Sequence, residues 1–188
     1  MLALVVELVR AVASAPEPER VAESVERLSV SDESGACTVA YAALLNAPPQ
    51  PRLKSAVDLA RRAAGLYGKR VEGRFVPDKP SSMAQVILAF ANYRAGDPLL
   101  AVQLANEILR SSSGRRSPEF TSQIWSVLAL SHRALDQQAD AQAALATAKK
   151  GIADKLMQIQ TGCPDDSWLH LLIASILLRE AESRVASE

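Results

Sequence analysis

The sequence contains few of the residues that most often build reactive sites. Its 188 residues include two cysteines, two histidines and only 4% aromatic residues. Cys37 and Cys163 form no CxxC motif, so we expect both to be reduced and structural. His132 and His170 lie far apart in the chain, and Asp136, one turn after His132, fits a helix cap or a position facing water. The sequence therefore predicts no metal ion and no cofactor.

The chain also has no excess of charge and no catalytic signature. Its 21 basic and 21 acidic residues cancel, which removes a general attraction to nucleic acid or to an anionic membrane. The segment GLYGK (65–69) lacks the spacing of a phosphate-binding loop, and HRALD (132–136) lacks the adjacent aspartate of a kinase catalytic loop. We expect a protein that is not an enzyme, with no catalytic residues and no nucleic-acid partner.

Local clusters of basic residues do not change this expectation. Lys149, Lys150 and Lys155 form one such cluster within a predicted helix. Basic side chains towards a helix C-terminus interact favourably with the helix dipole and are readily solvated. Nucleic-acid binding would also need interleaved aromatic residues for base stacking. We interpret the cluster as solvated surface.

The first fifteen residues, MLALVVELVRAVASA, form an apolar segment that could be a secretory signal or a helix. A signal would have a basic N-terminal region and an uninterrupted apolar centre, whereas Glu7 and Arg10 interrupt this one. The apolar residues recur at helical spacing: Leu2, Val5, Val6 and Val9. The segment is too short to span a bilayer. We expect an amphipathic helix in a soluble, cytoplasmic protein without a membrane partner.

Helical periodicity and an excess of Ala and Leu run through most of the remaining sequence. They predict an all-α fold of about nine helices, arranged as one domain over residues 1–188. Its predicted parts are N-terminal helices in 1–30, a degenerate helix pair in 36–67, helix pairs in 81–111 and 118–158, and a C-terminal capping helix in 165–186.

Glycine, proline and capping residues predict several boundaries between these helices. Gly96 should end the helix over 83–95, and Asp97 followed by Pro98 should open the next one. Residues 68–80 have no helical period. Their apolar residues fit either a short extended piece or an ordered loop.

An internal repeat links two of the predicted helix pairs. The segment YRAGDPLLAVQLANEIL (93–109) aligns with RALDQQADAQAALATAK (133–149). Gly96 then corresponds to Asp136 in the turn, and Ala101 corresponds to Ala141, five residues later in each copy. Repeated helix pairs with a small residue where the helices cross are typical of an α-solenoid.

These pairs resemble tetratricopeptide (TPR) repeats. In the later copy, the residues at the W, L, G, Y and then A, F, A positions of the motif are Trp125, Leu128, Ala129, His132, Ala141, Leu145 and Ala148. In the earlier copy, the corresponding residues are Gln85, Leu88, Ala89, Asn92, Ala101, Ala105 and Ile108. The closing proline of the motif is absent from both copies. The register predicts that Trp125 packs with Leu128 and Ala141, and that the His132 imidazole bonds to a neighbouring helix.

Over residues 36–186 the chain is also similar to the TPR-like C-terminal regions of some large bacterial serine/threonine protein kinases. The strings IWSVLALSHRAL and WLHLLIASILLREAE carry this similarity. It implies a regulatory or protein-binding region and no kinase activity.

The TPR resemblance implies a right-handed α-solenoid of antiparallel helix pairs, with first helices lining a concave groove. A groove of this kind binds an extended peptide or a partner helix. By the repeat register, the groove residues are Val86, Phe90, Tyr93, Arg94, Ser126, Leu130 and Arg133. Phe90 and Tyr93 would be aromatic anchors, and Arg94 and Arg133 would meet a partner carboxylate. Alternatively, these side chains only touch flanking helices of the same chain.

The sequence thus predicts a non-catalytic protein–protein interaction scaffold whose partner is a protein or peptide. The alternative is a structural, self-assembling module that forms a homodimer through the N-terminal helix. This alternative arises because MLALVVELVRAV lacks the polar outer face that a capping repeat needs.

Overall fold

The computed structural model describes residues 41, 44–45, 57–58, 60–61, 68–71, 74–77, 82–111, 117–160 and 168–186. The predicted helices of 1–30, the homodimer contact predicted there and both cysteines lie outside the described residues. The chain divides into two compact units, Met1–Ala95 and Gly96–Glu188. The sequence predicted one domain, and the boundary falls inside the helix pair predicted over 81–111.

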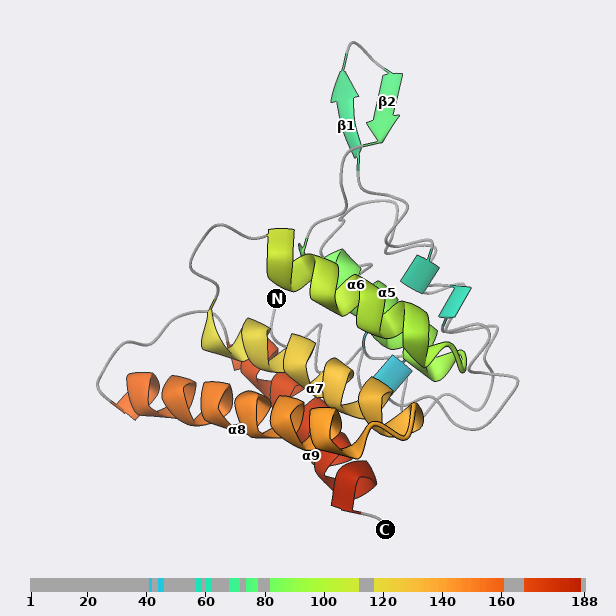
Figure 1. Ribbon diagram of the computed structural model, residues 1–188. Coiled ribbons are helices and arrows are strands. Elements are labelled where there is room, and N and C mark those ends of the chain that lie inside the picture. Colours follow the sequence, from blue (N-terminus) through green and yellow to red (C-terminus); the bar gives the residue numbers. More distant parts are fainter. Residues whose placement is uncertain are drawn as a thin grey trace, which may run out of the picture. The chain divides into compact units, whose positions relative to one another are not determined.

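The first unit contains a short β-hairpin that precedes a helix. Strand β1 (Gly68–Val71) pairs antiparallel with β2 (Arg74–Pro77), with Lys69 opposite Val76 (Figure 1). Val, Phe and other β-branched or aromatic residues favour extended backbone. Of the two interpretations of residues 68–80, the short extended piece is therefore the one found.

Helix α5 (Ser82–Arg94) packs its aromatic residues against one another and against Tyr41. The ring of Phe90 lies 6.1 Å from that of Tyr41 and 6.2 Å from that of Tyr93, measured between centroids. The guanidinium carbon of Arg94 lies 5.0 Å from the centre of the Phe90 ring, within reach of a cation–π interaction. Burial raises the pKa of the Tyr41 phenol, because the phenolate would lose its hydration.

The second unit is helical throughout its described residues. Its helices are α6 (Pro98–Ser111), α7 (Pro118–Ala134), α8 (Gln138–Gln160) and α9 (Trp168–Ala186), and all lie close to the predicted boundaries. Helix α7 contacts α6, α8 and α9, and so occupies the centre of the unit (Figure 1). Helices α8 and α9 also contact each other.

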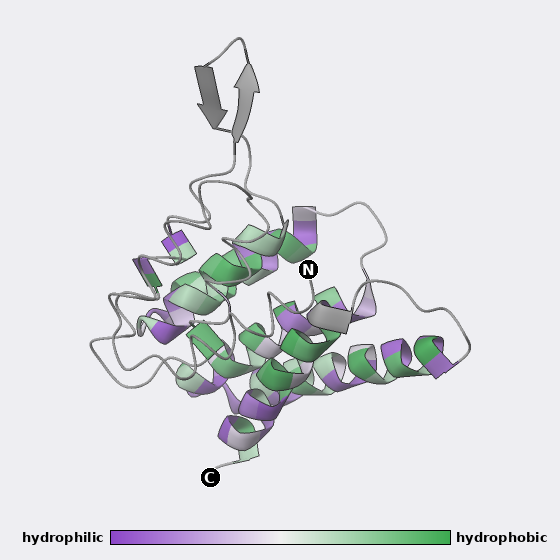
Figure 2. Ribbon diagram, turned by 180° about the vertical axis from the view of Figure 1, so that it is seen from behind, coloured by the Kyte–Doolittle hydropathy of each residue, from purple (hydrophilic) through white to green (hydrophobic). Residues whose placement is uncertain are grey.

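Helix α7 is buried on nearly all sides. Every residue from Ser122 to Ser131 is buried except Trp125, which is half-buried. A helix that is buried on all sides lies in the interior of its domain, with neighbouring helices on several faces. Leu128 and Ala141 join this core as expected, but Trp125 remains at its edge. In Figure 2 the ribbons of the helices alternate between apolar and polar residues along their length.

Small residues allow α7 and α8 to approach closely. Ser122 Oγ lies 2.9 Å from the carbonyl oxygen of Pro118 and 3.0 Å from that of Ala148, so its proton can be shared between the two helices. A Cβ atom on Gly151 would overlap Ser122 Oγ and would lie 2.9 Å from the Pro118 carbonyl oxygen. This contact fixes how α8 lies along α7.

The two aligned turns share a backbone feature. Gly96 has φ of 86° and Asp136 has φ of 59°, and both positions follow a helix C-terminus. Asp97 caps α6 as predicted, since the Leu100 amide donates to its Oδ1 at 3.1 Å. A left-handed residue at this position is the common way to end a helix.

Exchanging the residues at these turns should shift stability in opposite directions. Gly96→Ala should destabilise the fold by about 1 kcal/mol, because alanine is strained at positive φ even where space is open around it. Asp136→Gly should stabilise it by up to about 1 kcal/mol by relieving that strain. Little is lost with the carboxylate, whose 3.9 Å ion pair with Arg133 is exposed to solvent. Urea unfolding measures both changes, and equal signs would contradict this explanation.

The described part of the chain is mainly helical, in agreement with the predicted all-α class, but the predicted number of about nine helices is wrong for it and the right-handed α-solenoid is not confirmed. Five helices are found there, α5 to α9, together with the β-hairpin. A solenoid stacks successive pairs so that each contacts only its neighbours. Here the helices predicted as one pair over 81–111 are divided between two units, so such a stack is not established.

Candidate functional site

Most of the residues predicted to line a groove are buried in the protein. Val86, Phe90, Ser126 and Leu130 are each at most 1% exposed, whereas Tyr93, Arg94 and Arg133 are partly exposed. The seven residues are also divided between the two units. A buried side chain cannot contact a partner while the fold is intact.

The partly exposed members of this set have contacts within the chain. The rings of Tyr93 and Phe90 stack, and Arg94 lies over Phe90. Arg133 Nε donates to the carbonyl oxygen of Arg184 at 3.3 Å, which ties the end of α7 to the end of α9. Only the contact of Arg133 reaches another helix, since the contacts of Tyr93 and Arg94 with Phe90 lie within α5.

His132 has a local partner in place of the neighbouring helix that the sequence predicted. Its Nδ1 lies 2.6 Å from Oε1 of Gln137, in the connection between α7 and α8. The backbone N–H of Gln137 also donates to the backbone carbonyl oxygen of His132 at 2.9 Å. The imidazole therefore helps to close a turn.

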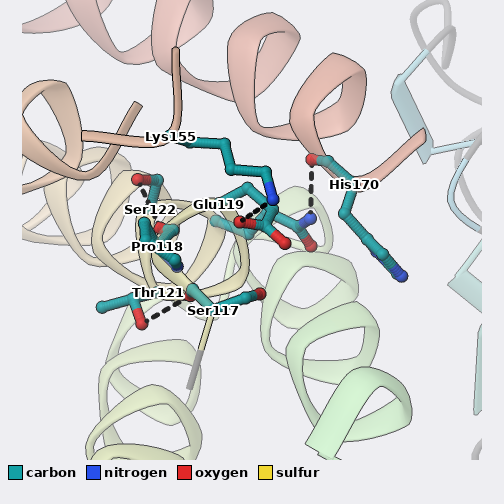
Figure 3. A network of polar contacts seen from close by, with 8 residues as sticks. Ser117, Pro118, Glu119, Thr121, Ser122, Lys155 and His170 are labelled. Atoms are coloured by element: carbon teal, nitrogen blue, oxygen red, sulfur yellow. Dashed lines mark hydrogen bonds and ion pairs between the residues drawn. The ribbon is translucent and has the colours of Figure 1, made fainter. Parts of the chain in front are cut away.

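The most unusual polar feature of the second unit is a buried ion pair between α7 and α8. Lys155 Nζ lies 3.7 Å from Glu119 Oε2, and both side chains are only 2% exposed (Figure 3). Charged residues are almost never fully buried without a partner, because each loses its hydration on burial. The interpretation of Lys155 as solvated surface is therefore wrong.

The local sequence explains how the two charges come together. Glu119 lies in the first turn of α7, after Pro118, where the helix dipole favours a carboxylate. Lys155 continues the buried stripe of α8, whose other members are Ala141, Ala144, Ala148 and Ile152. The spacing of three and four residues places Lys155 on the face that packs against α7. Its position in that stripe is the sequence signal for its burial.

The first turn of α9 approaches the same end of α7. Gln123 Nε2 donates to the carbonyl oxygen of His170 at 3.0 Å. The ring of His170 points away from Glu119 and Lys155, as Figure 3 shows. Burial lowers the pKa of His170, an effect that the negative charge of Glu119 partly opposes.

The chemistry open to this cluster follows from its burial. Solvent and substrate do not reach side chains that are 2% exposed, so Glu119 and Lys155 hold the helices in register in this conformation. Among the described residues, no group of three or more His, Cys, Asp or Glu side chains could hold a metal ion. The cluster is thus a structural centre for α7, α8 and α9.

A second feature that the sequence did not predict is a set of large apolar side chains exposed on α8 and α9. Helix α8 is longer than α7, and its last turns project beyond the first turn of α7 (Figure 1). Large apolar side chains are exposed there and on α9, namely Leu156, Met157, Ile159, Leu172 and Ile176. We refer to these five residues as the end surface.

Helices α8 and α9 run antiparallel, and two contacts join the first half of α8 to the last turns of α9. Lys149 Nζ lies 2.9 Å from Glu182 Oε1, and Gln138 Nε2 donates to the Val185 carbonyl oxygen at 3.2 Å. The start of α8 therefore lies beside the end of α9. Lys149 lies midway along α8 and Glu182 lies near the end of α9, so the two helices cross.

Comparison with known protein families, curated proteins and solved structures finds no match for this chain. Within the described ranges, no helix is both long and apolar enough to cross a membrane.

Proposed function

We propose that this chain is a non-catalytic protein-interaction module and that its partner contributes an amphipathic helix to the end surface. The observation that supports the proposal is the exposure of five large apolar side chains on α8 and α9 of a well-packed unit. Exposed apolar patches of this kind often mark interaction sites. The similarity to kinase-associated regions favours a regulatory role for such binding.

The face of α8 indicates what kind of partner fits. Between Ala141 and Lys155, the buried stripe of α8 packs on another helix, α7. Ile159 continues this stripe at the same spacing but is 41% exposed, because α7 begins only at Pro118. A partner helix with apolar residues at positions i, i+3 and i+4 would cover Ile159 as α7 covers Ile152.

Other members of the end surface suit such a partner. Leu172 and Ile176 are one helical turn apart and so share one face of α9. Leu156 is 47% exposed and lies about 60° from Ile159 around α8, so the same partner helix can reach it. Met157, which is 65% exposed, lies on the opposite side of α8.

A capture experiment with matched variants tests the proposal. The full chain, a Leu156→Glu/Ile159→Glu variant and an Ala143→Glu/Ala146→Glu control would be used to capture proteins from a lysate of the native source. The control changes exposed positions on the same helix. We expect the Leu156→Glu/Ile159→Glu variant to bind its partner about tenfold more weakly than the unmodified chain, equivalent to about 1.4 kcal/mol. The control variant should capture as much partner as the unmodified chain.

Cross-linking from position 156 then identifies the bound segment. An amphipathic helix of another protein would support the proposal. Equal capture by all three proteins, or a cross-linked segment that is not helical, would refute it. Sedimentation of the unmodified chain tests whether the occupant is a second copy, in which case wild type would dimerise and the variant would not.

A further inference from the structure

The first turn of α9 carries a histidine in surroundings that disfavour its protonated form. The Nδ1 atom of His170 is buried and makes no hydrogen bond within the part of the chain that the structure describes. A protonated imidazole has an N–H donor at both nitrogens. Protonation would therefore add a buried donor without an acceptor, which costs free energy.

The position of His170 in its helix adds to this cost. Helix α9 begins at Trp168, so His170 is the third residue from its N-terminus. The N-terminus of a helix carries a partial positive charge, which disfavours another cation nearby. A protonated His170 would thus be opposed by its own helix as well as by burial.

The charged groups of the neighbouring helices do not remove the penalty. From α7 the group that faces this site is Glu119, and from α8 it is Lys155, which are paired with each other (Figure 3). Because the carboxylate is already matched by the ammonium group, a second cation would be left without an equal countercharge. The His170 ring also points away from the carboxylate, so no direct hydrogen bond can compensate.

His170 also lies where α9 is attached to α7. Its carbonyl oxygen accepts the hydrogen bond from Gln123, a buried side chain of α7. We infer that the docking of α9 on α7 is acid-sensitive and that protonation of His170 loosens the first turns of α9. Leu172, in the second turn of α9, would move with them, so acid would also alter the end surface.

The direction of the pH effect follows from the histidine. The pKa of His170 lies below its ordinary value of 6.5 in the docked state, mainly because of burial. The undocked state therefore binds the proton first as the pH falls. The stabilisation from neutral His170 is fully present above pH 6.5, and it is lost as the pH falls towards the lowered pKa.

Amide hydrogen exchange of the full chain tests the inference, with the other histidine as a matched control. Exchange in α9 would be compared with exchange in α8 at about pH 7.5 and about pH 5.5, after correction for intrinsic rates. In wild type and in His132→Gln, protection of α9 should fall severalfold at the lower pH. In His170→Gln, which carries no titrating group at this position, this additional loss should disappear.

Two results would overturn the inference. One is α9 protection in wild type that does not change with pH, and the other is an equal loss in His170→Gln. If His170→Gln fails to fold, ring-proton NMR of the unmodified chain decides the matter, since the two histidines give two titrations. A pKa of His170 at or above 6.5 would contradict acid release, and a lower one would support it.

Discussion

Replacing Lys155 with methionine should destabilise the second unit by about 3–5 kcal/mol, because Glu119 would remain buried without its countercharge. Methionine has similar length and no charge, so loss of packing contributes little to the change. Urea unfolding at neutral pH, followed by circular dichroism, measures the effect.

The double variant Glu119→Leu/Lys155→Met separates the charge from the packing. Removing both charges leaves an apolar contact between α7 and α8, so most of the lost stability should return. A single-variant effect below about 1 kcal/mol, typical of surface pairs, would show that water reaches the ion pair. If the double variant remained as unstable as the single variant, the site would be unable to accept apolar side chains.

Leu130→Ala should destabilise the protein by about 2–5 kcal/mol, because Leu130 is 1% exposed and its truncation leaves a cavity. A residue that lined an open groove would give a much smaller change. Leu172→Ala is the matched control, since Leu172 is 49% exposed and surface substitutions usually change stability by less than about 0.5 kcal/mol. Thermal or urea unfolding of both variants distinguishes the core position from the groove position. If the two variants had similar stability, the result would contradict the burial of Leu130 in the core.

The ends of several helices could be predicted because they depend on nearby residues. Gly96 ends α5 at positive φ, and Asp97 caps α6 through its own side chain. Pro118 opens α7 at a position where no backbone donor is needed. Such signals act over a few residues, so they can be recognised without knowing what packs against the helix.

Burial could be predicted less well, because it depends on which helices surround a given face. The TPR register directs Ser126 and Leu130 towards a groove, but neighbours of α7 cover that face. Polar residues were a further source of error. Ser122 is buried because backbone oxygens of two helices surround its hydroxyl group, a compensation that no local pattern reveals.

Charge could be predicted least well, as Lys155 demonstrates. It belongs by spacing to the buried stripe of α8, yet its type and its place near other lysines indicated solvent. Its partner Glu119 precedes it by 36 residues and lies on another helix, a distance over which a single sequence shows no link. The exposure of the last turns of α8 was missed for a related reason, since it depends on where α7 begins relative to the end of α8.

The short connection between α7 and α8 has a consequence for how the chain folds. Only Leu135, Asp136 and Gln137 separate the two helices, so closing this hairpin costs little chain entropy. Contacts between residues close in sequence form quickly, whereas α9 must join from further along the chain. The α7–α8 hairpin can therefore form as an early folding nucleus, and α9 then assembles onto a surface that already exists.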